Sequence, residues 1–121
     1  MAKRRATGDL EAEVLAHLWA ARRPCTTAEV LRAMGGDLAY TTIETILNRL
    51  NGKRLVDRER VGRAFAYSPR LTEAELAAER MRATLDRASD RKAALTRFVD
   101  TLSRRDERAL RRILDELDEQ R

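Results

Sequence analysis

The chain has 121 residues, of which 43% are hydrophobic, 4% are aromatic and 37% are charged, and its formal net charge is +5. This length predicts one domain, or a small domain with an appendage. The scarcity of aromatic residues predicts a modest aliphatic core, and a core of that size is often stabilised by contact with a partner subunit. No run of about 18 apolar residues is present, which excludes a transmembrane helix, and the basic start MAKRRATGDL lacks the apolar segment of a signal peptide, so we expect a cytoplasmic protein.

The excess positive charge lies in the N-terminal part of the chain. Residues 1–70 contain 13 Lys or Arg and 8 Asp or Glu, whereas residues 71–121 contain 12 of each. This asymmetry favours binding to a polyanion, because contacts to phosphates release condensed counterions. A net charge of +5 is also ordinary for a soluble domain. Lys3, Arg4 and Arg5 form a candidate cationic arm.

Residues that carry catalytic or metal chemistry are scarce. Cys25 is the only cysteine and His17 the only histidine, so no intrachain disulfide can form and a structural zinc site would lack two ligands. The sequence contains no Gly-rich phosphate loop, HExxH or GxSxG motif. We therefore expect no enzyme activity, no metal site and no cofactor.

Three helices are predicted in chain order. The first covers about residues 9–21, with Asp9 as its N-cap, and Pro24 blocks its continuation. A capping box of Thr26 and Glu29 opens a second, short helix. A third helix follows Tyr40, and its apolar residues recur at the spacing of a face turned to a core: Ile43, Ile46, Leu47 and Leu50.

A short hairpin follows the third helix directly. Two strands, residues 56–60 and 64–67, are expected on either side of a turn at residues 61–63, where Gly62 permits a tight bend. The order of helix, short helix, amphipathic helix and hairpin is typical of a winged helix-turn-helix. The predicted fold class is mainly α with a small β-hairpin, and residues 1–70 form the predicted DNA-binding domain.

The third helix and the hairpin carry the candidate DNA-binding residues. Hydroxyl, amide and guanidinium groups on the polar face of the helix suit base edges and phosphates, and the arginines of the hairpin suit the phosphate backbone. These residues are Tyr40, Thr41, Thr42, Thr45, Asn48, Arg49, Arg58, Arg60 and Arg63. Asp57 and Glu59 reduce the charge of the hairpin. Glu44 either accepts a hydrogen bond from a cytosine amino group or pairs with a neighbouring arginine.

Residues 71–121 form the predicted helical dimerisation region. A capping box of Thr72 and Glu75 opens one helix, and Ser103 favours the start of the last one. Two apolar stripes follow helical spacing and are the candidate dimer contacts: Leu95, Phe98, Val99, Leu102, Leu110, Ile113, Leu114 and Leu117. A two-fold dimer would bury these stripes and present two reading helices to a palindromic operator. The alternative is a monomer whose C-terminal helices fold back on the head.

The stretch AYTTIETILNRLNGKRLVDRERVGRAFAYSP resembles the signature of the penicillinase-repressor family of the BlaI/MecI type, with its GRAxxYxP hairpin. The segment LEAEVLAHLWA is similar to that family's opening, and RKAALTRFVDTLSRRDERALRRILDEL is similar to its C-terminal dimerisation helices. The resemblance spans nearly the whole chain. It implies a dimeric repressor that binds inverted repeats in duplex DNA, at promoters of β-lactamase or cell-envelope genes linked to antibiotic resistance.

The resemblance also implies an inducing mechanism. In the best-known members a membrane-bound sensor protease triggers cleavage of the repressor at an Asn-Phe bond. The matching position in this chain is Arg97–Phe98, where arginine stands in place of the asparagine. The copper-sensing branch of the superfamily uses a cysteine-rich C-terminal motif that this chain lacks. A winged-helix scaffold that binds another protein through its hairpin edge is the alternative function.

Overall fold

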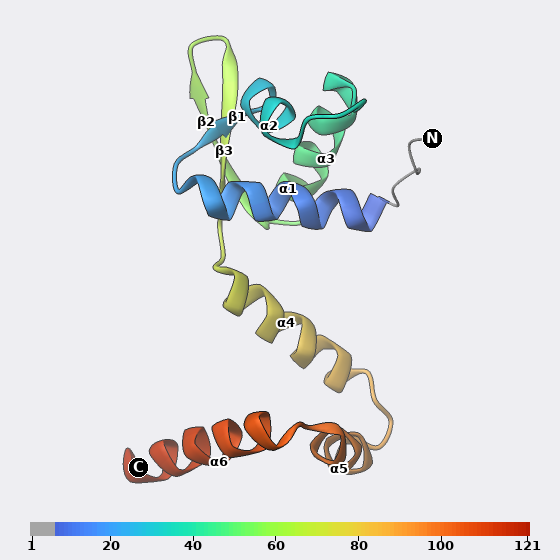
Figure 1. Ribbon diagram of the computed structural model, residues 1–121, viewed down its shortest axis with the longest axis vertical. Helices are drawn as coiled ribbons and strands as arrows, with labels where there is room; N and C mark the ends of the chain where they lie inside the picture. Colours follow the sequence, from blue (N-terminus) through green and yellow to red (C-terminus); the bar gives the residue numbers. More distant parts are fainter. Residues whose placement is uncertain (1–6) are drawn as a thin grey trace. The chain divides into compact units, whose positions relative to one another are not determined.

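The computed structural model describes residues 7–121, so the candidate arm at Lys3, Arg4 and Arg5 lies outside the described residues. Its elements, shown in Figure 1, are in order α1 (Thr7–Ala21), β1 (Cys25–Thr26), α2 (Thr27–Met34), α3 (Tyr40–Gly52), β2 (Val56–Val61), β3 (Ala64–Pro69), α4 (Glu73–Asp86), α5 (Arg91–Thr101) and α6 (Arg104–Glu119). The predicted class, mainly α with a winged helix-turn-helix, is confirmed. Within the described residues, no helix combines the length and apolar character needed to span a bilayer.

The chain divides into two compact units. The first ends at Leu76 and the second covers Ala77–Arg121, so the division falls inside α4. The boundary after residue 70 stays a prediction of where the functional regions meet.

One aliphatic core holds the first unit together. Apolar side chains at helical spacing on α1 and α3 meet those of α2, the sheet and the first turn of α4. The core residues are Leu10, Val14, Leu15, Leu18, Cys25, Val30, Ile43, Ile46, Leu47, Leu50, Val56, Tyr67 and Leu76. The predicted buried face of α3 is confirmed, because all four of its apolar residues are buried. This burial fixes which face of α3 is left for solvent.

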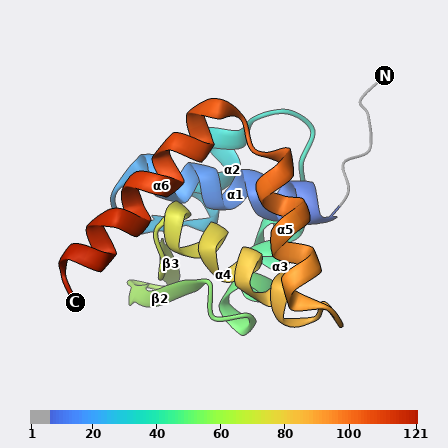
Figure 2. The ribbon, with the colours of Figure 1, turned by 90° about the horizontal axis from the view of Figure 1, so that it is seen from below.

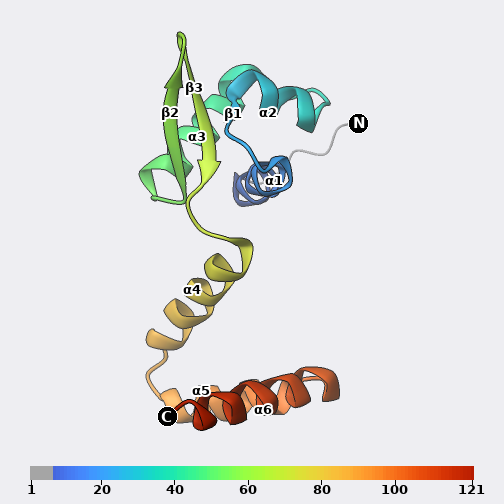
Figure 3. The same ribbon diagram turned by 90° about the vertical axis from the view of Figure 1, so that its left-hand side faces the viewer.

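The sheet has three strands in the order β1-β3-β2, and all of its pairings are antiparallel. The hairpin of β2 and β3 is longer than predicted: Val61 pairs with Ala64, which leaves a two-residue turn at Gly62 and Arg63. Gly62 has a φ of +64°, the conformation that a type II′ turn requires at its first central position. Figure 3 shows that this hairpin extends beyond the neighbouring helices and ends in a free tip.

Several helix starts are capped as the sequence predicts. Thr26 and Glu29 form both hydrogen bonds of a capping box at α2. At α4, the N–H of Glu75 donates to Oγ1 of Thr72 at 3.1 Å, and the N–H of Thr72 donates to Oε1 of Glu75 at 3.2 Å. The predicted N-cap at Asp9 is wrong, because α1 begins at Thr7 and places Asp9 in its first turn.

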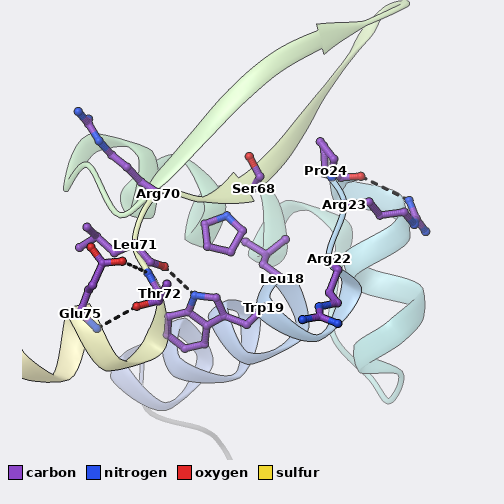
Figure 4. A pocket seen from close by; sticks show the side chains of 11 residues that line it. Leu18, Trp19, Arg22, Arg23, Pro24, Ser68, Arg70, Leu71, Thr72 and Glu75 are labelled. Atoms are coloured by element: carbon purple, nitrogen blue, oxygen red, sulfur yellow. Dashed lines mark hydrogen bonds between the residues drawn. The ribbon is translucent and has the colours of Figure 1, made fainter.

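The segment that leaves the sheet is fixed by Trp19 of α1. Its indole N–H donates to the carbonyl oxygen of Leu71 at 2.8 Å, beside the capping box of α4 (Figure 4). Trp19 also packs against the core. Because Trp19 is the only tryptophan, its fluorescence reports on the first unit alone.

An ion pair joins α1 to the end of α3. Nζ of Lys53 donates to both carboxylate oxygens of Glu11, at 2.9 and 3.0 Å, and the Glu11 side chain is only 11% exposed. Lys53 caps the C-terminal end of α3. This contact therefore ties the candidate reading helix to the scaffold.

Replacing Lys53 with methionine is expected to lower the free energy of unfolding by about 1–3 kcal/mol, because it leaves a nearly buried carboxylate without its partner. Urea denaturation followed by Trp19 fluorescence measures this loss. The double variant Glu11→Gln with Lys53→Met is the control and should recover most of it. Equal stability of the wild type and the single variant would contradict the proposed role of this pair.

The second unit does not enclose a core of its own. Neither α5 nor α6 contributes a buried residue. Figure 2 shows α5 and α6 as two separate rods joined by a short connection. The connection contains Ser103, whose side chain accepts from the N–H of Asp106 and caps α6 as predicted. About half of the surface of the large apolar side chains on α5 and α6 therefore faces solvent in the single chain.

Candidate nucleic-acid interface

The polar face of α3 is accessible along its length. Tyr40, Thr41, Thr45, Asn48 and Arg49 are exposed, and Thr42 is half-buried. They lie opposite the buried apolar face of the same helix. The periodicity that buries one side of α3 thus presents hydroxyl, amide and guanidinium groups on the other, the groups that hydrogen-bond to base edges and phosphates.

The N-terminal end of α3 differs from the starts of α2, α5 and α6. Its N-cap residue is Ala39, which forms no side-chain capping bond, whereas the other three helices have a Thr, Asp or Ser cap. The N–H of Thr42, the group that a capping side chain would bind, donates instead to the carbonyl oxygen of Ala39 at 3.1 Å. Within the described residues, the N–H groups of Tyr40 and Thr41 have no partner. Such N–H groups, together with the helix dipole, favour an anion at this end.

The hairpin separates its charges onto two faces. Cross-strand partners share a face, so the pairs Arg58↔Tyr67 and Arg60↔Phe65 put both arginines on one side. The pairs Asp57↔Ser68 and Glu59↔Ala66 put the two acids on the other side. The expected reduction of the hairpin's charge by Asp57 and Glu59 therefore does not apply to the arginine face.

The arginine face of the hairpin is the one that meets α3. Tyr67 lies on this face and is 2% exposed, and its hydroxyl donates to Oδ1 of Asn48 at 3.4 Å. This bond orients the Asn48 amide and leaves its NH₂ group for another acceptor. Tyr67 was missing from the sequence-based candidates because its partner lies 19 residues away along the chain.

Within the described residues, neither Glu44 nor Cys25 has a partner that would give it a chemical role. Glu44 is exposed and has no partner within the described residues, so the arginine pair considered for it does not form there. Cys25 is buried in the core, and this burial raises the pKa of its thiol, which keeps the sulfur protonated and unreactive at neutral pH. No group of three His, Cys, Asp or Glu residues able to hold a metal ion exists in the described part of the chain.

The pKa of Glu29, the capping residue of α2, is lower than that of an ordinary glutamate. The hydrogen bond from the N–H of Thr26 lowers the pKa of its carboxyl, and an ion pair with Arg23 at 2.7 Å adds to the effect. Glu29 therefore keeps its charge, and its part in the cap, in mildly acidic conditions. This capped turn precedes α3 and contributes to a rigid support for it.

The candidate dimer residues are accessible in the single chain. Leu95, Phe98, Val99, Ile113, Leu114 and Leu117 are between 45% and 52% exposed, and Leu102 and Leu110 are half-buried. The candidate cleavage position, Arg97–Phe98, lies inside α5. Cleavage there requires α5 to unwind locally, because a protease binds its substrate as an extended strand.

Comparison with known proteins identifies this architecture. A family model described as penicillinase repressor matches residues 7–116. The transcriptional regulator BlaI of Mycobacterium tuberculosis (strain CDC 1551 / Oshkosh) is 43% identical over 123 aligned residues, covering 98% of this chain and 89% of the relative. The protein of the same name from strain ATCC 25618 / H37Rv gives the same figures.

A solved structure agrees with the first unit. The solution structure of the DNA binding domain of the repressor BlaI is similar with a TM-score of 0.50 and 29% identity, and the match covers 62% of this chain and 93% of that domain. The chain therefore belongs to the penicillinase repressor family, a family of transcriptional repressors and not of enzymes.

Proposed function

We propose that this protein is a dimeric repressor that binds an inverted-repeat operator in duplex DNA, with α3 in the major groove and the hairpin along the phosphate backbone. The observation that carries this proposal is that two candidate DNA-binding surfaces lie next to each other. The polar face of α3 and the arginine face of the hairpin adjoin through the hydrogen bond between Tyr67 and Asn48. Both surfaces can therefore engage one stretch of duplex.

In this proposal, some of the candidate DNA-binding residues contact base edges and the others contact phosphates. Thr42, Thr45, Asn48 and Arg49 reach base edges, since their donors, acceptors and methyl groups suit the major groove. Tyr40 and Thr41 hold a phosphate at the uncapped start of α3. Arg58, Arg60 and Arg63 hold phosphates beside the groove. Glu44 then accepts a hydrogen bond from a cytosine amino group.

Dimerisation through the second unit is supported by its exposed apolar surface. Within the described residues, six of the eight apolar residues in the stripes of α5 and α6 remain 45–52% exposed. Between α4 and α5 lies an apolar hollow of about 620 Å³, lined by Met81, Leu85, Leu95 and Phe98 among others. An exposed apolar surface of this extent is typical of an interface. A second copy of the same chain is its proposed occupant, which gives a two-headed protein for a palindromic site.

Release of the operator requires only that the two heads separate. Two linked heads have an effective-concentration advantage of about a hundredfold or more, which separated heads lose. Proteolysis near Arg97–Phe98, by a membrane-bound sensor protease or another inducing protease, would remove α6 and part of α5. We propose β-lactamase or cell-envelope genes as targets and the cytoplasm as the place of action, by extension from the family.

Substitutions in α3 and in the hairpin test the proposed division of work. Thr45→Ala should relax sequence preference by about 1–3 kcal/mol at one base pair per half-site. Arg63→Gln should weaken binding to all sequences alike and reduce the slope of log affinity against log salt by about 1. Fluorescence anisotropy with operator and scrambled duplexes, over a range of salt concentrations, measures both effects.

Arg112→Gln, which removes the same charge from α6, is the control and should change neither property. The reverse pattern for Thr45 and Arg63 would overturn the assignment of reading helix and wing. A wild-type protein that binds duplex DNA without a steep dependence on salt would instead favour the protein-binding scaffold.

A further inference from the structure

Phe65 is an exposed aromatic residue with two arginines against its ring. The guanidinium carbon of Arg58 lies 4.3 Å from the ring centre and that of Arg60 lies 5.5 Å from it. Phe65 is 37% exposed and takes no part in the core. Packing of the first unit therefore does not account for this aromatic side chain.

The register of the hairpin explains why the three side chains meet. Arg60 is the cross-strand partner of Phe65, and Arg58 is its diagonal neighbour on the same face. Both guanidinium carbons thus lie within 5.5 Å of one ring centre, so a single ring contacts both cations.

Contact with a ring leaves the hydrogen-bonding capacity of an arginine intact. The guanidinium donors lie in the plane of the group, so the face of an aromatic ring attracts the cation without accepting those hydrogen bonds. A carboxylate would accept them instead. Within the described residues neither Arg58 nor Arg60 forms an ion pair, and Asp57 and Glu59 lie on the other face of the hairpin. Both arginines therefore keep their donors for a ligand.

We propose that Phe65 is a positioning residue that holds Arg58 and Arg60 as a clamp for one backbone phosphate of the duplex. This inference rests on the proposed DNA-binding function and adds a residue to it. The ring restricts the rotamers of two long side chains before binding, which lowers the entropy that binding would otherwise cost. Arg63, at the tip of the hairpin, lies outside this clamp and binds a different phosphate.

The test compares Phe65→Leu with the wild type. The variant keeps every charge, so the salt slope should stay unchanged while affinity for all duplexes falls about three- to tenfold. Phosphate-ethylation interference on an operator duplex gives the sharper readout. Ethylation of one phosphate per half-site should weaken the wild type but no longer affect Phe65→Leu, while interference at the Arg63 phosphate persists.

Three further variants separate positioning from folding. Phe65→Tyr retains the ring and should restore both affinity and interference. Val61→Thr alters an exposed side chain on the opposite face of the same hairpin and should bind like the wild type. Arg58→Lys keeps the ring and the charge but lacks the planar fork, so it should lose interference at the same phosphate even if Phe65→Leu does not fold.

The outcomes distinguish this inference from the proposed function. Operator binding with unchanged affinity and unchanged interference in Phe65→Leu or Arg58→Lys would overturn the clamp and leave DNA binding standing. Loss of interference at the Arg63 phosphate as well would also overturn it, since the whole hairpin would then be disturbed. A wild-type protein that binds no duplex would overturn the proposed function itself.

Discussion

Replacing Leu114 with glutamate should convert the protein to monomers and weaken operator binding by about a hundredfold or more. Leu114 is 52% exposed in the single chain and lies in the middle of the apolar stripe of α6. A carboxylate buried in an apolar interface loses hydration without gaining a partner, which disfavours the dimer strongly. Binding of each separate head, with its lower affinity, should remain.

The design of this experiment rests on a charge-matched control. Arg112→Gln changes the net charge by the same one unit, on the face of α6 away from the apolar stripe, and should leave the protein dimeric. Analytical ultracentrifugation measures the state of assembly, and anisotropy with full-site and half-site duplexes measures affinity. A dimeric Leu114→Glu variant would show that the stripe is not the interface. A monomeric variant with undiminished affinity would show that the heads bind independently.

Leu47→Ala should lower the free energy of unfolding of the first unit by about 2–5 kcal/mol. Leu47 is fully buried in the middle of α3, so truncation removes apolar contacts and leaves a cavity under the reading helix. Trp19 fluorescence during urea denaturation, at one fixed protein concentration, measures the loss in the first unit. DNA affinity should fall as the folded fraction falls.

Thr45→Ala provides the matched comparison on the same helix. Thr45 is exposed, two residues before Leu47, and its truncation should change the stability of the first unit by less than about 0.5 kcal/mol. Substitutions on the buried face of α3 should therefore change the free energy of unfolding, and substitutions on its exposed face should change the DNA sequence preference. If both substitutions destabilised the unit equally, the assignment of one buried and one exposed face to α3 would be wrong.

Local sequence signals predicted most of the fold, because they act over a few residues. The capping boxes at Thr26 and Thr72 form as expected. The apolar residues of α3 are buried, and the glycine at the hairpin turn has the positive φ that the turn requires. The strand β1 did not follow from the sequence, since two residues carry no alternating pattern and its pairing with β3 depends on tertiary contact.

The candidate site was predictable in its parts but not in its arrangement. Residue types along α3 identified the exposed polar side chains, because helical periodicity separates its two faces. Alternation along one strand separates Arg58 and Arg60 from Asp57 and Glu59, but the register between β2 and β3 was needed to place Phe65 and Tyr67 on the arginine face. The contacts of Tyr67 with Asn48, and of Phe65 with both arginines, needed the packed structure, since they join residues from different elements or strands.

The central claim is that paired α3 helices, each backed by an arginine-faced hairpin, read an inverted repeat in duplex DNA. Sequencing of the genomic fragments bound by the purified full-length protein, at moderate salt, tests it most directly. The predicted result is a small set of promoter fragments sharing an inverted repeat, with half-site centres spaced by about one helical turn of DNA or a multiple of it. Recovery of fragments with no shared sequence, or with a single unrepeated half-site, would contradict it.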